Sequence, residues 1–158
     1  MNERFKKDTL LIGAVAGTIA KVIQDAIGFI IITFFLPTYI NCVRIAGGLL
    51  LTPNEMMSGG FWPSLLGFQI DLIVSIVVGI ISVLILQHWG HDYYLFKGAM
   101  IGLVCWVLLY IVLSKLLSSV YPFGSILHAE ISFIKHITYG IVLTWVAVWF
   151  GKLSDNRV

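Results

Sequence analysis

Four long apolar blocks dominate the pattern of hydrophobic and polar positions along this 158-residue chain. They run approximately over residues 9–36, 62–86, 95–117 and 126–150. Each block is long enough to cross a hydrocarbon core of about 30 Å as a helix, which takes roughly 20 residues. The connections are too short to hold a separate soluble domain. The pattern therefore predicts an all-α polytopic membrane protein, with residues 1–158 forming one membrane domain that folds as a four-transmembrane-helix bundle.

Composition supports a membrane protein and excludes several other classes. Hydrophobic residues make up 59% of the chain and charged residues 11%, against about 45–50% and about 25% in soluble domains. No nucleophile elbow, zinc-protease motif, phosphate-binding glycine loop or nucleic-acid signature occurs. Cys42 and Cys105 form neither a CxxC pair nor a metal-binding spacing, so they are interpreted as packing residues. The sequence predicts a lipid bilayer as partner, and no cofactor, metal ion or nucleic acid.

The lysines and arginines that flank the four blocks predict the orientation. The side with both termini contains six of them: Arg4, Lys6, Lys7, Lys97, Lys152 and Arg157. The other side contains two, Arg44 and Lys115. Because short cytoplasmic flanks carry the excess of positive charge, we expect a multi-pass protein of the cell membrane with its N-terminus and C-terminus in the cytoplasm.

The outer connection, residues 37–61, is too long for a simple turn. Its first part, residues 38–45, predicts a short interfacial helix with Arg44 facing the headgroups. Further on, Thr52, Pro53 and Glu55 have the spacing of a helix capping box. A membrane-surface connector is the favoured interpretation, and a gate or binding element is the alternative.

A repeat of small residues and proline relates the first and third blocks at an offset of 85 residues. The matching positions are Gly13 and Gly98, Ala14 and Ala99, Gly17 and Gly102, and Pro37 and Pro122. The two GxxxG pairs indicate which helix faces pack closely. The offset predicts a parallel pseudo-repeat of two helix hairpins, 2+2, related by an axis along the membrane normal.

Polar residues gather on one face of three of the four predicted spans. They are Lys21, Gln24 and Asp25 on the first, Asp71 and Ser75 on the second, and Ser132, Lys135, His136 and Tyr139 on the fourth. An ionisable group at the bilayer centre costs about 2.5–3.5 kcal/mol, so such groups face the bundle interior and find partners. The two lysines balance the two aspartates. We therefore expect one buried network near the midplane, with His136 as its most readily titrated member.

Two interpretations of this network compete. As a substrate or proton site, it makes the protein a small transporter or a transport-complex component, with a small polar or ionic ligand and with proton coupling as an option. The alternative is a non-catalytic membrane subunit or scaffold whose buried ion pairs only hold the helices together. A third, less favoured class is an intramembrane enzyme that acts on lipid. A site should line a cavity open toward the outer face at Asp71 and His136, whereas a scaffold needs none. A homo-oligomer and a larger membrane complex both remain open.

The layout resembles that of the small four-span bacterial membrane proteins of the YqhR type across most of the chain. The resemblance is carried by Gly13, Gly17, Pro37, Gly98, Gly102 and Pro122. It implies a bacterial inner membrane and no particular activity.

Overall fold

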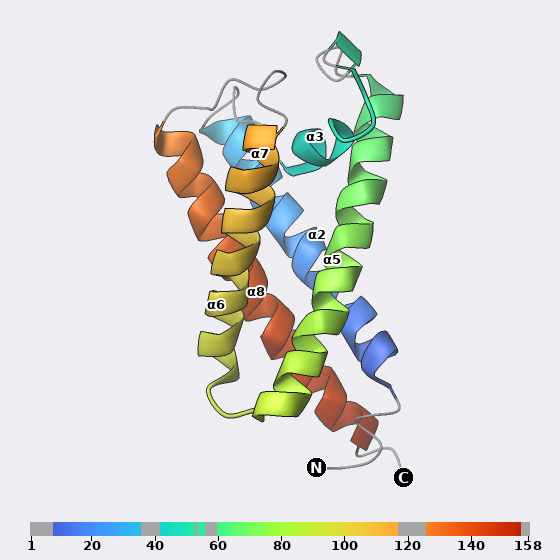
Figure 1. Cartoon of the computed structure of the whole chain (residues 1–158), viewed down its shortest axis with the longest axis vertical. Helices are drawn as coiled ribbons and strands as arrows, with labels where there is room; N and C mark the ends of the chain where they lie inside the picture. Colours follow the sequence, from blue (N-terminus) through green and yellow to red (C-terminus); the bar gives the residue numbers. More distant parts are fainter. Residues whose placement is uncertain (1–7, 36–41, 53, 56–59, 117–125, 156–158) are drawn as a thin grey trace.

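The computed structural model describes residues 8–35, 42–52, 54–55, 60–116 and 126–155, and within these the chain forms helices and no strand (Figure 1). Two unbroken long helices form the first hairpin, α2 (Thr9–Phe34) and α5 (Phe61–Trp89), with the short α3 (Cys42–Gly47) between them. The third long element consists of α6 (Tyr94–Cys105), the π-helix η1 (Trp106–Val112) and α7 (Leu113–Leu116) in direct succession, and α8 (Ile126–Asp155) follows.

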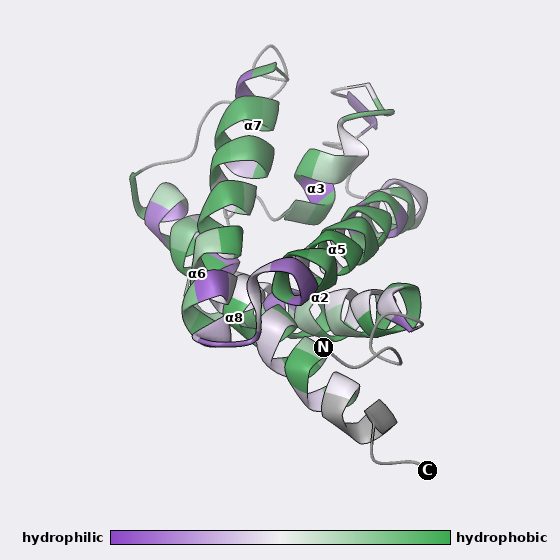
Figure 2. Ribbon diagram, turned by 60° about the horizontal axis from the view of Figure 1, so that its bottom comes forward, coloured by the Kyte–Doolittle hydropathy of each residue, from purple (hydrophilic) through white to green (hydrophobic). Residues whose placement is uncertain are grey.

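Four of the described elements are long and apolar enough to cross a membrane. They cover Thr9–Ile31, Phe61–Trp89, Tyr94–Val112 and Ile126–Gly151. Large apolar side chains such as Phe29, Ile73 and Leu108 are exposed on their outer surfaces, and hydrophobic residues predominate along the spans (Figure 2). The predicted all-α fold with four spans is confirmed, and the chain is a multi-pass integral membrane protein.

The four spans are arranged as two helix pairs. α2 packs mainly against α5, α6 packs mainly against α8, and α2 and α8 pack against each other at the centre of the bundle (Figure 1). α5 and α6 make few contacts with each other. We call the end with Thr9, the α5–α6 connection and the last turn of α8 the Thr9 end, and the opposite end the α3 end.

Glycines allow the two helices of each pair to pack closely, and the contacts are equivalent in the two pairs. A Cβ on Gly79 of α5 would collide with the carbonyl oxygen of Gly13 and lie 3.0 Å from the amide nitrogen of Gly17. A Cβ on Gly140 of α8 would collide with the Gly98 carbonyl oxygen and lie 2.7 Å from the Gly102 nitrogen. The two GxxxG pairs therefore each receive a glycine from the partner helix, as a 2+2 pseudo-repeat requires. Pro37 and Pro122 lie outside the described residues.

At the α5–α6 connection, a lysine ammonium binds the carbonyl groups at the end of α5. Lys97 donates hydrogen bonds from its ammonium to the carbonyl oxygens of Trp89 and Gly90, each at 2.8 Å. The last carbonyls of a helix have no partner within the helix, so this ammonium satisfies two of them at the end of α5 and favours its dipole.

The outer connection partly follows the expectation. Its helix, α3, exposes Arg44 as predicted but buries Ile45, Ala46 and Gly47 against the bundle, so it packs onto α5 rather than lying only at the surface. Residues 38–41 lie outside the described part. Further on, the Glu55 carboxylate accepts hydrogen bonds from the Thr52 amide at 2.9 Å and the Thr52 hydroxyl at 2.7 Å, which lowers the pKa of Glu55. This is the return half of the predicted capping box.

The glycine contacts predict a symmetric effect of adding one methyl group. Gly79→Ala and Gly140→Ala each place a Cβ against backbone atoms that cannot rotate away, and we expect each to destabilise the fold by about 1–3 kcal/mol. Thermal unfolding in detergent would measure the loss. Ala26→Val, on an exposed face of α2, is the control and should change stability little; equal stability of all four proteins would contradict the close packing.

Candidate functional site

A buried ammonium joins two helices at the middle of the membrane-spanning helix α2. Lys21 is the thirteenth of the 26 residues of α2, and its side chain is 1% exposed. Its Nζ lies 2.5 Å from Asp25 Oδ1 and 2.6 Å from Asp71 Oδ2. Asp25 is one turn further along α2, the spacing at which side chains of one helix face meet, whereas Asp71 comes from α5. We call these three residues the Lys21 group.

The Lys21 group has more acceptors than its ammonium satisfies. Asp25 Oδ2 is buried and accepts no hydrogen bond from any described residue. An acceptor left unsatisfied in a buried place costs about 1–3 kcal/mol, and more when it is charged. With all three side chains ionised, the group has one negative charge in excess.

Lys135 does not line the same place. Its side chain is 2% exposed, and its Nζ lies 2.6 Å from the position that a Cβ on Gly28 would occupy. Gly28 is seven residues, about two helical turns, beyond Lys21 on α2. The sequence analysis matched the charges of two lysines with those of two aspartates. In the structure both aspartates contact the same lysine, Lys21.

A cavity adjoins the Lys21 group between α5 and η1, where the two helix pairs make little contact. The centres of water-sized molecules have about 50 Å³ of space in it. Its polar lining includes six of the predicted site residues, Lys21, Gln24, Asp71, Ser75, His136 and Tyr139. One water needs about 10–15 Å³ on this measure, so several waters or a small solute fit. A network that served only as a tie between helices would not require this space.

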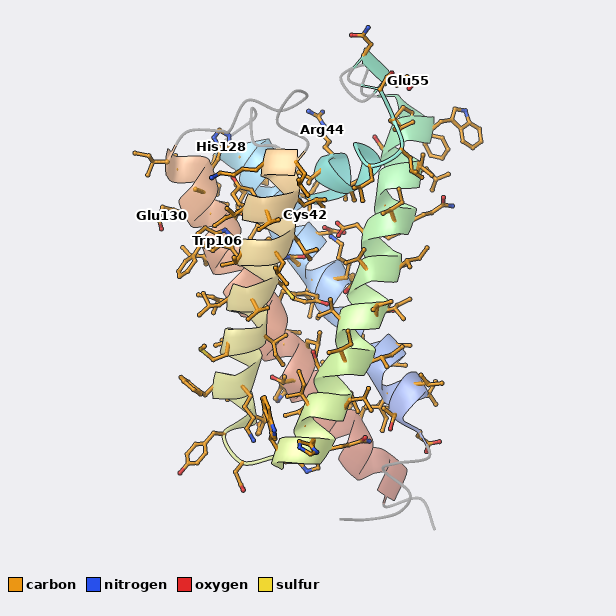
Figure 3. All side chains as sticks on the ribbon, viewed as in Figure 1. Cys42, Arg44, Glu55, Trp106, His128 and Glu130 are labelled. Atoms are coloured by element: carbon orange, nitrogen blue, oxygen red, sulfur yellow. The ribbon has the colours of Figure 1, made fainter. Side chains whose placement is uncertain are left out.

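The short helix α3 covers the cavity at the α3 end. Cys42, Ile45 and Ala46 of this helix contribute to the lining. Figure 3 shows Arg44, on the same helix, pointing away from the bundle. Asp71 and His136 therefore line one cavity, with the six-residue helix α3 between it and that end of the protein, and the opening toward the outer face stays a prediction.

Two buried side chains, His136 and Gln24, contribute polar groups to the cavity wall. His136 Nδ1 lies 2.7 Å from the Ser132 carbonyl oxygen, which only accepts, so Nδ1 carries the hydrogen and Nε2 is an acceptor in the neutral ring. Gln24 is 5% exposed and also lines the cavity. The cavity thus has an imidazole nitrogen and an amide available to a ligand.

Hydrogen bonds hold three helices together at the inner wall of the cavity. The Ser75 hydroxyl donates to the Gly17 carbonyl oxygen at 2.8 Å and lies 2.8 Å from the Tyr139 hydroxyl. Tyr139 also donates to the Ser75 carbonyl oxygen at 3.3 Å. This arrangement connects α2, α5 and α8, so the Lys21 group and His136 sit on a fixed frame.

The structure places six of the nine predicted site residues in the cavity lining and the other three outside it. Asp25 contacts Lys21 without lining the cavity, and Ser132 fixes the orientation of His136 through its carbonyl oxygen. Lys135 is buried beside Gly28.

Several lining residues were missed by the sequence interpretation. Cys42 and Cys105 both face the cavity, although they were interpreted as packing residues. Tyr110 of η1 lies with its ring centre 6.5 Å from that of His136 and stacks on Trp106 at 6.3 Å. A signal was present, because Trp106 and Tyr110 are spaced four apart in a stretch, residues 98–113, that contains no charged residue.

Comparisons of the chain with protein-family models, with curated proteins and with solved structures find no match in any of the three. The function is therefore argued from the geometry of the site.

The shared ammonium gives a test by double substitution. Lys21→Met leaves two buried carboxylates without their cation and should destabilise the protein by about 3–5 kcal/mol. Adding Asp71→Asn removes one unpaired charge and should recover part of that loss, which a double-mutant cycle of thermal unfolding would measure. Lys115→Met, at an exposed position, should have little effect. Strictly additive losses for Lys21 and Asp71 would contradict the pair.

Proposed function

We propose that this protein is a small transporter, or the membrane component of a transport complex, and that the cavity beside the Lys21 group is its solute site. One observation carries the proposal: an ion group in the middle of a membrane helix adjoins a space large enough for several waters. Ionisable side chains at this depth are costly, and in membrane proteins they mark solute or proton paths.

The state of the polar groups supports a site over a structural tie. A group of ion pairs that only fastens helices is most stable when it is dry and every polar atom is bonded. Here Asp25 Oδ2 is buried and has no hydrogen-bond partner among the described residues. Ser75 and Tyr139 already connect the helices through hydrogen bonds, so the charges are not needed for that purpose.

Asp71 provides a physical means of proton coupling. When a proton neutralises Asp71, Lys21 retains its ion pair with Asp25 of the same helix. The ion pair between α2 and α5 is lost. Such a local charge change can bias a larger rearrangement of packed helices. The ionisable residues around Asp71 come from five elements: Lys21 and Asp25 of α2, Cys42 of α3, Cys105 of α6, Tyr110 of η1, and His136 and Tyr139 of α8.

The orientation belongs to the same proposal. The excess of lysine and arginine at the Thr9 end supports cytoplasmic termini, with α3 on the outer side of a bacterial cell membrane. The cavity then lies nearer the outer surface, because Asp71 is the eleventh of the 29 residues of α5, counted from the α3 end.

The natural cysteines test whether the cavity exchanges with water. In a Cys42→Ala protein, Cys105 should react with a small charged methanethiosulfonate reagent, because that reaction needs a thiolate and a water path. A cysteine introduced at Val104, the exposed neighbour on the apolar surface, is the matched control for a thiol in lipid. We expect Cys105 to react at least about tenfold faster than the control. Equal, negligible rates would favour the scaffold.

Orientation is tested with cysteines at two exposed sites, Asn54→Cys and Asp92→Cys, in a protein without Cys42 and Cys105. In intact cells an impermeant thiol reagent should label the first and spare the second. The reverse pattern would place the termini outside.

A further inference from the structure

We infer that the cavity binds a small N–H cation, ammonium or a short primary alkylammonium ion, through Asp71, Gln24 and His136. This inference rests on the proposed solute site and names the class of its ligand.

The charge balance favours a cation over an anion. With its three side chains ionised, the Lys21 group has one negative charge in excess, and Asp71 is the carboxylate of this group that faces the cavity. Lys135 does not line the cavity, and its ammonium is held beside Gly28. A monovalent cation on Asp71 would make the occupied site neutral, whereas an anion would add a second unpaired negative charge in a place of low dielectric constant.

The remaining polar atoms are suited to a hydrogen-bond donor. His136 is 4% exposed, and its Nδ1–H is directed to Ser132, which leaves Nε2 as an acceptor. Gln24 offers an amide oxygen from α2, and Asp71 offers its carboxylate from α5. An ammonium ion has four N–H donors, enough for these three acceptors. The ammonium of Lys21 already lies 2.6 Å from Asp71 Oδ2, so this carboxylate accepts an N–H cation.

The same donor set is poor for a metal ion. Calcium takes six to eight oxygen ligands and magnesium requires six in regular geometry, and no group of three or more His, Cys, Asp or Glu residues within the described part of the chain is arranged to hold a metal. Aromatic rings help a nitrogen cation, because Tyr110 stands beside His136 and can present its face to the charge.

The size of the cavity limits the ligand. The space of about 50 Å³ for water-sized centres admits ammonium or methylammonium. A tetramethylammonium ion has no N–H group and needs more room, so it matches neither the acceptors nor the volume.

Thermal unfolding of the purified full chain in lipid nanodiscs, at constant pH and ionic strength, tests the inference. Ammonium chloride and methylammonium chloride should raise the Tm with saturation, since a ligand that binds only the folded state stabilises it. Sodium chloride and tetramethylammonium chloride should not. An equal response to sodium and ammonium, or no response to any salt, would overturn the inference.

Variants assign the effect to the cavity. Gln24→Leu removes one acceptor without changing charge and should raise the apparent Kd for methylammonium about tenfold or more. Asp71→Asn should abolish the response. Asp92→Asn removes an exposed carboxylate outside the cavity and should respond like the parent. If Asp71→Asn does not fold, Gln24→Leu and the cation selectivity of the parent decide the question, and an unchanged Kd in Gln24→Leu would contradict the site.

Labelling of Cys105 separates the two proposals. If Cys105 reacts and methylammonium slows its reaction, both are supported. If it reacts and no N–H cation affects either the rate or the Tm, the ligand class is wrong and the solute site stands. If it neither reacts nor responds to cations, both are wrong.

Discussion

The charge on Lys21 is the constraint on which the centre of this protein depends. An ammonium in the middle of a membrane helix cannot remain without partners, and the chain supplies one carboxylate from the same helix and one from the next. The second contact fixes the register of α5 on α2. The two helices can approach that closely because Gly13, Gly17 and Gly79 present backbone instead of side chains at the crossing. Close packing thus makes the ion group possible.

The same close packing also creates the cavity. Each GxxxG pair brings its helix onto one partner, and α2 and α8 meet in the middle, so α5 and η1 are held on opposite flanks. Side chains from these two flanks do not fill the space between them, and α3 closes it at one end. A glycine also allows the close contact between α5 and α3, because a Cβ on Gly67 of α5 would collide with the Val43 carbonyl oxygen of α3. A helix of only six residues can therefore pack onto the bundle as a cover.

The sequence predicted the parts that depend on local spacing or on mean hydropathy. Four spans follow from apolar length, and the contact of Lys21 with Asp25 follows from their separation of four residues. Spacing on one helix could not show that Asp71 shares this lysine or that Lys135 lies beside Gly28, because both depend on how different helices cross. Nor can hydropathy separate an apolar residue that faces lipid, such as Leu108, from its neighbour Leu109, which lines the cavity. The π-helix η1 was missed for a related reason: its widened turns carry the same apolar residues as an α-helix.

The two helix pairs share a backbone arrangement and differ in chemistry. Gly17 faces the Ser75 carbonyl oxygen as Gly102 faces that of His136, and in each case the partner glycine follows four residues later. By this equivalence Ser75 corresponds to His136, and Asp71, four residues earlier, corresponds to Ser132. The first pair therefore contributes the charges and the second an imidazole, on walls that meet at one cavity. Two copies of the first pair would bring four carboxylates and two ammonium groups together, whereas two copies of the second would bring the buried ammonium of Lys135 twice and no buried carboxylate. The glycines of the two helix pairs pack in the same way, but the residues between them differ. Because of this difference, the bundle has one charged site instead of two or none.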